Sequence, residues 1–287
     1  MPVGHRFPID KYKKLRERLQ KYALMGVHFE FIEPHAATDA ELLRVHHKDY
    51  IGRVMAGTLS KEEIRRIGFP WSQELVQRSL RSTGAAVDAA LAALRDGVAA
   101  SLAGGTHHAF PGHGEGFCVL NDIAVTIKIL LQEKKIKKAL IIDLDVHQGN
   151  GTAEALKDDI NTFTFSMHCG KNYPFVKANS DLDIELDEGT GDTEYLHVLN
   201  QHVLDVLTKV NPDIVFYLAG VDVVEGDRYG RLNLSRSGLQ KREQFILGLM
   251  KRLSLPVVIL MSGGYATTPG ITADLHAEVH RAAYTFY

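Results

Sequence analysis

The sequence predicts an α/β fold with one open, mainly parallel sheet and helices on both of its faces. Two observations predict it. Short apolar segments alternate regularly with amphipathic helical segments, and the short segments are apolar throughout. Strands that are buried on both faces of a parallel sheet have that continuous apolar character. No repeat, low-complexity segment or linker divides residues 1–287, so we expect a single domain.

The expected elements follow the hydrophobic periodicity and the turn residues along the chain. The expected helices are residues 10–25, 42–51 (LLRVHHKDYI), 72–95, 120–133, 151–157, 192–209, 235–253 and a last one from about 270. The expected strands are residues 27–32, 98–102, 138–143, 162–167, 213–219 and 256–261. From residue 98 onward, strands and helices alternate, as in consecutive βαβ units.

Composition and charge argue against several classes of function. The net charge is −2 and the pI about 6.7, so we expect no direct binding to nucleic acid. Cys118 and Cys169 are too few and too far apart for a CxxC metal site or a disulfide framework. The N-terminus is polar, and no apolar run approaches the ~20 residues of a membrane helix. We therefore expect a cytoplasmic protein without membrane contact.

Reactive residue types follow four of the expected strands. The segments are GGTHH, DLDVH, AGVDVVEGD and SGGY, after the strands near residues 100, 140, 216 and 259. Ligands bind outside the carboxyl ends of the strands in open parallel sheets. The four segments should therefore converge on one site.

The segment DLDVH indicates a metal site. Asp143, Asp145 and His147 occupy alternate positions, so in an extended chain they share a face. One Asp at a strand end would more simply be a helix N-cap, but two neighbouring buried carboxylates are costly without a cation. Asp145, His147 and Asp222 from another strand end would leave a coordination position open for water or substrate. We predict a hydrolytic metal site at these three residues.

Three further residues have the chemistry of proton exchange or oxyanion binding. His107 and His108 follow two glycines at a strand exit, where imidazoles can face a pocket. Tyr265 follows Ser262-Gly263-Gly264, and its phenol could donate to a developing oxyanion. Packing alone would also account for these three residues, and we expect only packing or surface roles for the other histidine pair, residues 46–47.

Five segments, in this order, resemble the zinc-dependent histone deacetylase family: GGTHHAFPGHGEGFCVLNDIA, IIDLDVHQGNGT, TFSMH, LAGVDVVEGDRYGRLNLS and MSGGY. The resemblance spans nearly the whole chain. It implies the arginase/deacetylase fold and the hydrolysis of an N-acyl group, typically acetyl-lysine, to a free amine and a carboxylate. HRFP near the start, Asn150, GDRYG and SGGY are most similar to the class IV and bacterial class II-like branches.

The resemblance implies roles for the residues at the strand ends. The matching residues are Asp145, His147 and Asp222 as zinc ligands, His107 and His108 as the tandem acid–base pair, and Tyr265 as the phenol that polarises the substrate carbonyl together with zinc. Water would attack as His108 removes its proton, and either histidine would then protonate the leaving amine. A carboxylate-rich ligand set could also accept Fe²⁺ or Co²⁺.

The resemblance also implies supporting residues. Asp143 looks like a carboxylate that orients His107. The implied channel residues are Gly116, Phe117, Tyr173, Gly263 and Gly264, where the Gly116 carbonyl could accept the substrate amide N–H and the two aromatic rings would grip the acyl-lysine stem. A K⁺ or Na⁺ site is implied at Asp143, Asp145, His147, Ser166 and Met167.

The chain departs from the family pattern at two places. Asn150 stands where many members have an Asp that pairs with the second histidine. An amide stabilises an imidazolium less than a carboxylate does, so we expect a lower pKa for His108 than in those members. Family members usually have a further strand before HRFP, and this chain begins just upstream of that segment, so we expect a shortened form.

Two other functions fit parts of the pattern. A binuclear manganese ureohydrolase of the arginase type would need an Asp-x-Asp pair, whereas Asp222 precedes Val223 and Val224. A catalytically silent acyl-lysine-binding protein would not need the complete set of reactive residues. The sequence leaves the substrate open, because an acetylated protein, a long-chain acyl-lysine, an acetylpolyamine and another small amide all present the same reacting group.

Overall fold

The computed structural model describes residues 5–24, 26 and 29–287. Within these residues, six strands form one sheet in the order β1-β6-β5-β2-β3-β4, and every neighbouring pair is parallel. The strands are β1 Val98–Ser101, β2 Ala139–Asp143, β3 Thr162–Cys169, β4 Leu182–Leu186, β5 Ile214–Leu218 and β6 Val257–Leu260. All their carboxyl ends therefore lie at one edge of the sheet.

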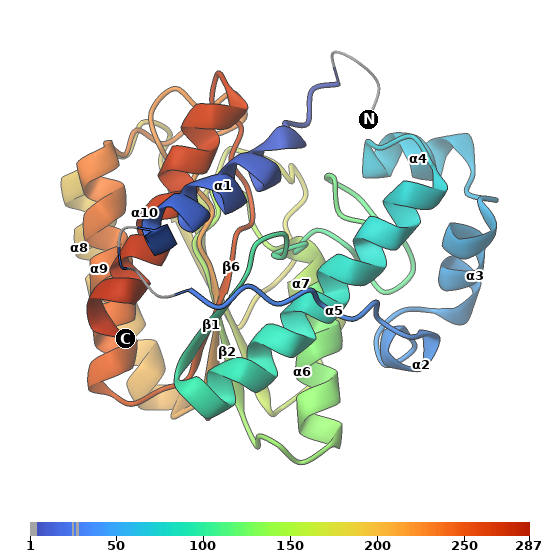
Figure 1. The fold of residues 1–287 in the computed structure, drawn as a ribbon, viewed down its shortest axis with the longest axis horizontal. Coiled ribbons are helices and arrows are strands. Elements are labelled where there is room, and N and C mark those ends of the chain that lie inside the picture. Colours follow the sequence, from blue (N-terminus) through green and yellow to red (C-terminus); the bar gives the residue numbers. More distant parts are fainter. Residues whose placement is uncertain (1–4, 25, 27–28) are drawn as a thin grey trace.

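Helices cover both faces of this sheet (Figure 1). The helices are α1 Asp10–Leu24, α2 Asp39–Leu42, α3 Lys48–Ala56, α4 Lys61–Ile67, α5 Gln73–Asp96, α6 Asp122–Gln132, α7 Asn150–Leu156, α8 Asp192–Val210, α9 Arg236–Arg252 and α10 Pro269–Phe286. One apolar cluster joins the sheet to α8, α9 and α10, and another joins the opposite face to α5, α6 and α7. The fold class predicted from the sequence is confirmed.

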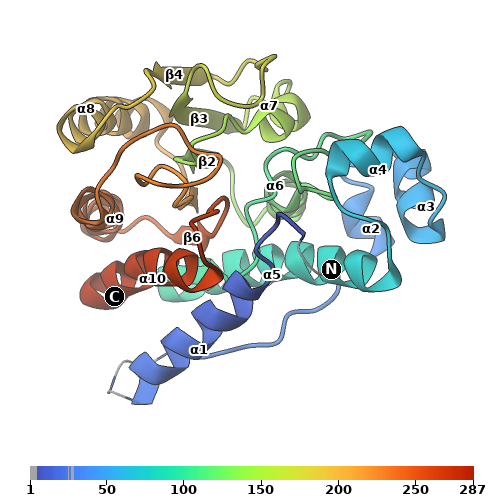
Figure 2. The same cartoon turned by 90° about the horizontal axis from the view of Figure 1, so that it is seen from above.

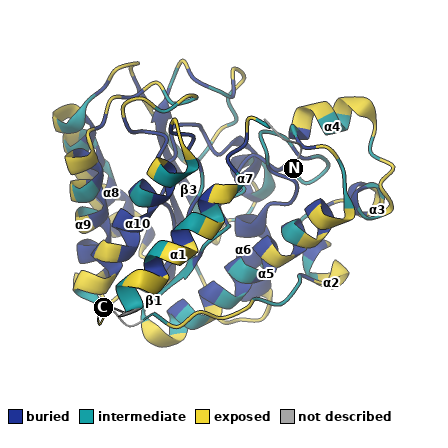
Figure 3. Ribbon diagram, turned by 45° about the horizontal axis from the view of Figure 1, so that its top comes forward, coloured by how far each residue is buried: buried dark blue, intermediate teal, exposed yellow. Residues whose placement is uncertain are grey.

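Alternation along β2 shows how one strand serves both layers. Leu140 and Ile142 pack in the cluster with α8–α10, whereas Ile141 packs in the cluster with α5–α7. All five residues of β2 are buried. Figure 3 shows the same layering, with the helices buried toward the sheet and exposed on their outer faces. The continuous apolar character of the strand segments thus has a direct physical cause.

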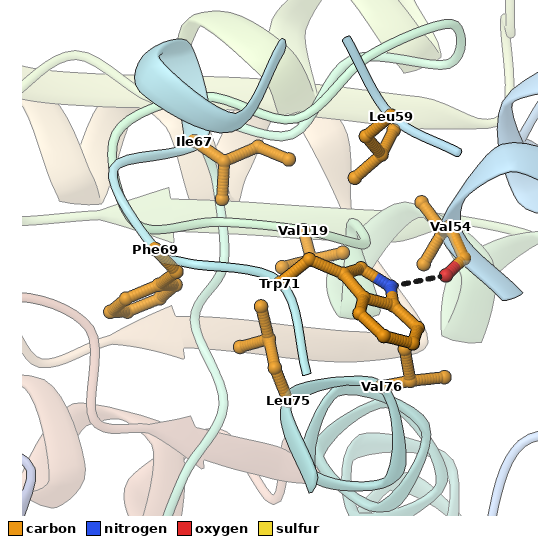
Figure 4. Close-up of a pocket in the computed structure, with 8 residues that line it drawn as sticks. All are labelled: Val54, Leu59, Ile67, Phe69, Trp71, Leu75, Val76 and Val119. Atoms are coloured by element: carbon orange, nitrogen blue, oxygen red, sulfur yellow. Dashed lines mark hydrogen bonds between the residues drawn. The ribbon is translucent and has the colours of Figure 1, made fainter. Parts of the chain in front are cut away.

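A smaller layer of α2, α3 and α4 lies beside α5, while α1 packs on α10 (Figure 2). An apolar cavity lies under α3 and α4, with Trp71 across it donating a 2.8 Å hydrogen bond to the Val54 carbonyl (Figure 4). Ile67, at the end of α4, also lines this cavity. The cavity belongs to the packing of this layer, because its lining is apolar apart from the indole N–H, which is already paired.

Several elements differ from those predicted. Residues 29–32 are not a strand, and residues 27–28 of that prediction lie outside the described residues. The helix predicted over 42–51 is wrong in its middle, because α2 ends at Leu42 and α3 begins at Lys48. β4 was not predicted, since its sequence LDIEL is acidic and only partly buried at the sheet edge. Among the described residues, no helix is long and apolar enough to cross a membrane.

Candidate active site

The site lies where the order of the strands changes direction. From β2 the chain moves outward to β3 and β4, and it then returns to β5 on the other side of β2. Open α/β sheets bind ligands at such a switch point. Asp145 and His147 follow β2, and Asp222 follows β5, so the predicted ligands come from the two strands that flank it.

Asp145, His147 and Asp222 form a buried group with the spacing of metal ligands. One donor atom of each residue lies within 4.8 Å of the other two. His147 Nδ1 is 3.0 Å from Asp145 Oδ1 and 3.4 Å from Asp222 Oδ2. His147 is 7% exposed, and Asp145 and Asp222 are 1% exposed or less. The structure therefore brings the predicted trio together.

Asp145 and His147 do not share a strand face, contrary to what their alternate positions predicted. β2 ends at Asp143, and the chain bends over residues 145–147 instead of continuing as a strand. The bend is fixed by side chains, because Asp143 Oδ1 accepts the Asp145 N–H at 3.1 Å and Asp145 Oδ1 accepts the His147 N–H at 2.9 Å. Local hydrogen bonds, rather than a shared strand face, aim the ligands at one point.

The charges at this point fit a bound cation. Burial and the neighbouring Asp145 raise the pKa of Asp222 to about 6. Burial opposes a charge on His147, but the nearby carboxylates of Asp145 and Asp222 outweigh it and raise its pKa to about 10. Asp222 Oδ2 is buried and has no hydrogen-bond partner among the described residues. Two buried carboxylates that favour the charged form of the imidazole between them form a site that attracts positive charge.

Gly263 keeps the space between these donors open. A Cβ at this position would collide with the Asp222 carboxylate and lie 2.6 Å from Asp145 Oδ2. The Gly263 N–H donates to the same Asp145 oxygen at 2.6 Å, and the Ser262 hydroxyl does so at 2.7 Å. Gly264, with φ +155°, has no room for a side chain, because a Cβ there would lie 2.6 Å from the Val221 side chain. The donor set and the cradle both fit a metal ion.

His107 and His108 lie side by side with different partners. Their ring centroids are 4.1 Å apart, and both residues are buried. His107 Nδ1 is 2.7 Å from Asp143 Oδ2, whereas His108 Nδ1 is 2.7 Å from Asn150 Oδ1. His107 Nε2 is 3.9 Å from Asp145 Oδ1, so the pair borders the metal-ligand group.

The two imidazoles have opposite pKa shifts. Burial lowers the pKa of His107, but the charges of Asp143 and Asp145 outweigh it and raise the pKa to about 9. Burial, together with the positive charges of His107 and His147, holds the pKa of His108 well below its usual 6.5. At neutral pH the first imidazole is therefore charged and the second is neutral.

Tyr265 lines the same pocket as the two histidines, Asp145 and His147. Burial and the charges of Asp222 and Asp145 hold its phenol pKa well above 10, so it remains a hydrogen-bond donor. Its backbone is held on both sides. The Tyr265 N–H donates to Asp227 Oδ2 at 2.6 Å, and Arg228 Nε donates to the Tyr265 carbonyl at 3.0 Å.

A tight turn carries the predicted channel residues Gly116 and Phe117. Both have positive φ, +56° and +66°, and the Cys118 N–H closes the turn on the Glu115 carbonyl at 2.8 Å. A side chain at position 116 would lie 2.6 Å from the His108 ring. Phe117 accepts a left-handed conformation that is unfavourable for a bulky residue, and its ring lies 6.0 Å from that of Tyr265.

Tyr173 lies beside His108 and His147. Its ring meets His108 edge-on at 5.0 Å and His147 at 6.1 Å, and its hydroxyl donates to Glu115 Oε1 at 2.8 Å. Of the residues predicted for the monovalent-cation site, Ser166 is the register partner of Asp143 on the neighbouring strand. Met167 is fully buried in the next position of β3.

Three further residues that were not predicted from the sequence shape the site. Lys11 in α1 is only 1% exposed, and its Nζ donates to the Ser262 and Gly264 carbonyls, both at 3.3 Å. Its ammonium is 5.1 Å from the centre of the Tyr265 ring. Asp227 and Glu115 lie within segments that the resemblance included, GDRYG and GHGEGF, but nothing in the sequence indicated their partners. His46 packs as expected, accepting the Asn121 N–H.

Together, the fold and the site define an α/β protein whose buried Asp–His–Asp group lies beside a histidine pair and a tyrosine. Comparison with known proteins places it further: the Histone deacetylase domain model matches residues 5–281, and the chain belongs to that family. The predicted family is confirmed. The predicted proximity to the class IV and bacterial class II-like branches stays a prediction.

Relatives and a solved structure agree with this membership. The chain is 43% identical to an uncharacterized protein of Picosynechococcus, over all of this chain and 95% of that protein. It is 32% identical to Histone deacetylase 2 of Arabidopsis thaliana, over 82% of this chain and 63% of that protein. The crystal structure of the HDA15 HD domain superposes with a TM-score of 0.82 at 23% identity, covering 99% of this chain and 84% of the other, which shows the same fold.

Proposed function

We propose that this chain is a metal-dependent amidohydrolase that removes an acyl group from an N-acyl-lysine or a similar N-acyl amine. One observation carries the proposal: the buried group of Asp145, His147 and Asp222 lies beside two imidazoles with opposite pKa shifts. Pairs of titratable groups whose surroundings separate their pKa values are typical of acid–base catalysis. Family membership supports the same reaction.

The three ligands favour Zn²⁺, since two carboxylates and one imidazole leave a coordination position for water or substrate. Fe²⁺ is the runner-up metal for this donor set. When bound, such a metal ion would lower the pKa of a water molecule and polarise the substrate carbonyl. Gly263 would hold Asp145 in place, through its N–H and through the space that its missing side chain leaves.

The protein's own groups would move the protons. His108 is neutral at neutral pH, so it can accept a proton from the attacking water. His107 carries a proton, held by Asp143, and can stabilise negative charge or donate to the departing amine. Tyr265 keeps its phenolic proton and would donate a hydrogen bond to the oxygen on which charge develops.

The rings of Phe117 and Tyr173 would bind the aliphatic stem of the substrate, and Gly116 would contribute its carbonyl. Family resemblance supports a K⁺ or Na⁺ site at Asp143, Asp145, His147, Ser166 and Met167, behind the catalytic group. An acyl-lysine side chain is the substrate class we propose, and the name of the Arabidopsis relative supports it.

A hydrolysis panel tests the proposal. Acetyl-lysine peptides, long-chain acyl-lysine peptides and acetylpolyamines would be incubated with the protein as purified, after chelation, and after Zn²⁺ is restored. We expect hydrolysis of at least one amide, its loss on chelation and its return with Zn²⁺. An Asp222→Asn variant with reduced zinc content should be inactive in parallel. Binding of a peptide without turnover by the zinc-loaded protein would instead indicate an acyl-lysine-binding protein and overturn the proposal.

A further inference from the structure

Glu115 is a carboxylate at the site to which neither the predicted catalytic roles nor the metal group assigns a function. It precedes the turn of Gly116 and Phe117, and its side chain is 17% exposed. Its Oε1 accepts two hydrogen bonds of 2.8 Å, from Asn150 Nδ2 and from the Tyr173 hydroxyl. The His113 ring nitrogen Nε2 is 3.7 Å from its other oxygen.

Asn150 links this carboxylate to His108. Its Oδ1 is 2.7 Å from His108 Nδ1, and its Nδ2 donates to Glu115. An amide oxygen only accepts, so Nδ1 of the imidazole must carry the hydrogen in this contact. The other ring nitrogen, Nε2, is then free of hydrogen in the neutral imidazole and is the atom that can accept a proton.

The opposite orientation of the amide would have the opposite effect. Turned by 180°, Asn150 would present its NH₂ group to His108 Nδ1, which would then have to accept. The neutral imidazole would carry its hydrogen on Nε2, and that nitrogen could no longer act as a base. A carboxylate at position 150 would accept in either orientation. The need for a fixed orientation therefore arises because this position is an amide.

Glu115 supplies what fixes that orientation. Burial opposes its ionisation, but the nearby His113 ring and the hydrogen bonds from Asn150 and Tyr173 outweigh it and lower its pKa to about 2. As an ionised carboxylate it can only accept. Turning the amide would place the Asn150 oxygen against this carboxylate, so two acceptors would face each other without a hydrogen. Leaving such partly buried groups without a hydrogen-bond partner is unfavourable, so the observed orientation is preferred.

We propose that Glu115 is a positioning residue of the hydrolytic site: through Asn150 it holds His108 in the tautomer whose Nε2 can accept a proton. The inference rests on the proposed amidohydrolase function and deepens it. The same oxygen holds the Tyr173 hydroxyl, so one acceptor fixes both the orientation of the base and one wall of the substrate channel.

A rescue experiment with full-length, zinc-loaded protein tests the proposal. We expect Glu115→Ala to lower kcat about two- to tenfold, because a fraction of the His108 population then has the wrong tautomer. Asn150→Asp, added to this variant, should restore most of the lost kcat, because an aspartate accepts from His108 Nδ1 in either orientation and no Glu115 carboxylate then faces it. Glu115→Gln keeps the side-chain volume and should lie between Glu115→Ala and the wild type. Zinc content and thermal unfolding of each variant would be measured alongside.

Tyr173→Phe is the matched control, since it removes only the second hydrogen bond of Glu115. We expect it to raise KM with a much smaller change in kcat, whereas Glu115→Ala should act mainly on kcat. A wild-type kcat in Glu115→Ala would overturn the inference, and so would a loss that Asn150→Asp does not restore. If the wild-type protein hydrolyses no amide in the panel above, the proposed function itself has failed, which is a different result.

Discussion

The two rings of the histidine pair have nearly identical surroundings, but one is charged and the other is neutral. His107 and His108 are 3% and 5% exposed, and each Nδ1 lies 2.7 Å from a side-chain oxygen. The partner is a carboxylate in one case, Asp143, and an amide in the other, Asn150. Burial lowers the pKa of both imidazoles, so burial does not explain the difference. The charge of the partner, with that of the nearby Asp145, decides which ring is charged.

The two imidazoles should therefore have different catalytic roles. The charged His107 can stabilise negative charge, and the neutral His108 can accept a proton. Replacing each imidazole in turn should separate these roles. We expect His108→Gln to lower kcat about 10³-fold, since the proton acceptor is lost, and His107→Gln to cost about 10²-fold or less. Steady-state kinetics with zinc content measured in parallel would check it. A larger loss in His107→Gln would reverse the assignment.

Tyr265 should be essential for turnover, but replacing it should not change the protonation of His107 or His108. Its phenol would donate a hydrogen bond to the developing oxyanion, so Tyr265→Phe should lower kcat about 10²- to 10³-fold. The phenol does not hydrogen-bond to Asp143 or Asn150, the partners of the two imidazoles. Zinc content should be unchanged, and the remaining activity should keep the wild-type pH profile. Wild-type activity in this variant would contradict the proposed role, while a shifted profile would show that the phenol titrates with the histidines.

Asp143→Asn would give His107 the kind of partner that His108 has. Losing the carboxylate lowers the pKa of His107 from about 9, so less of it is charged near neutral pH. If the charged form is required, activity falls as pH rises through this pKa, and the alkaline limb of the pH–rate profile should move to lower pH. We expect kcat near neutral pH to fall about tenfold. An unchanged alkaline limb would contradict this.

Asn150→Asp is the converse change and should have the smallest effect near neutral pH. A carboxylate next to His108 raises its pKa, which in the wild type lies well below 6.5. Because the base must be neutral, activity falls as pH drops through this pKa. The acid limb should therefore move to higher pH, with kcat on the plateau changed only about two- to fivefold. A pH–rate profile that did not move would argue that the amide does not set the proton affinity of His108.

Much of the site could be predicted from the sequence, because parallel strands bring their carboxyl ends together. Asp222 is far along the chain from Asp145 and His147. The apolar strands that precede the two segments nevertheless predicted that all three side chains would converge. Other contacts could not be predicted. Lys11 lies in a charged amphipathic helix, and only the packing of α1 on α10 places its ammonium under Tyr265.

The elements that were missed have local causes. β4 has a sequence with alternating acids, because it is an edge strand with one neighbour, and the strand pattern of a buried sheet does not apply to it. The predicted helix over residues 42–51 has good helical periodicity, but His47 is the N-cap of α3 and the preceding residues form a turn. The role of Glu115 depends on which way one amide faces, which no periodicity records.

The most direct test of the account is ¹⁵N NMR of the imidazoles in the zinc-loaded protein near neutral pH. Variants with His107→Gln and His108→Gln would assign the two rings. The account predicts that His108 is neutral, with hydrogen on Nδ1 and a bare Nε2, and that Glu115→Ala mixes the two tautomers. A charged His108, or a neutral ring with hydrogen on Nε2, in the wild-type protein would contradict it.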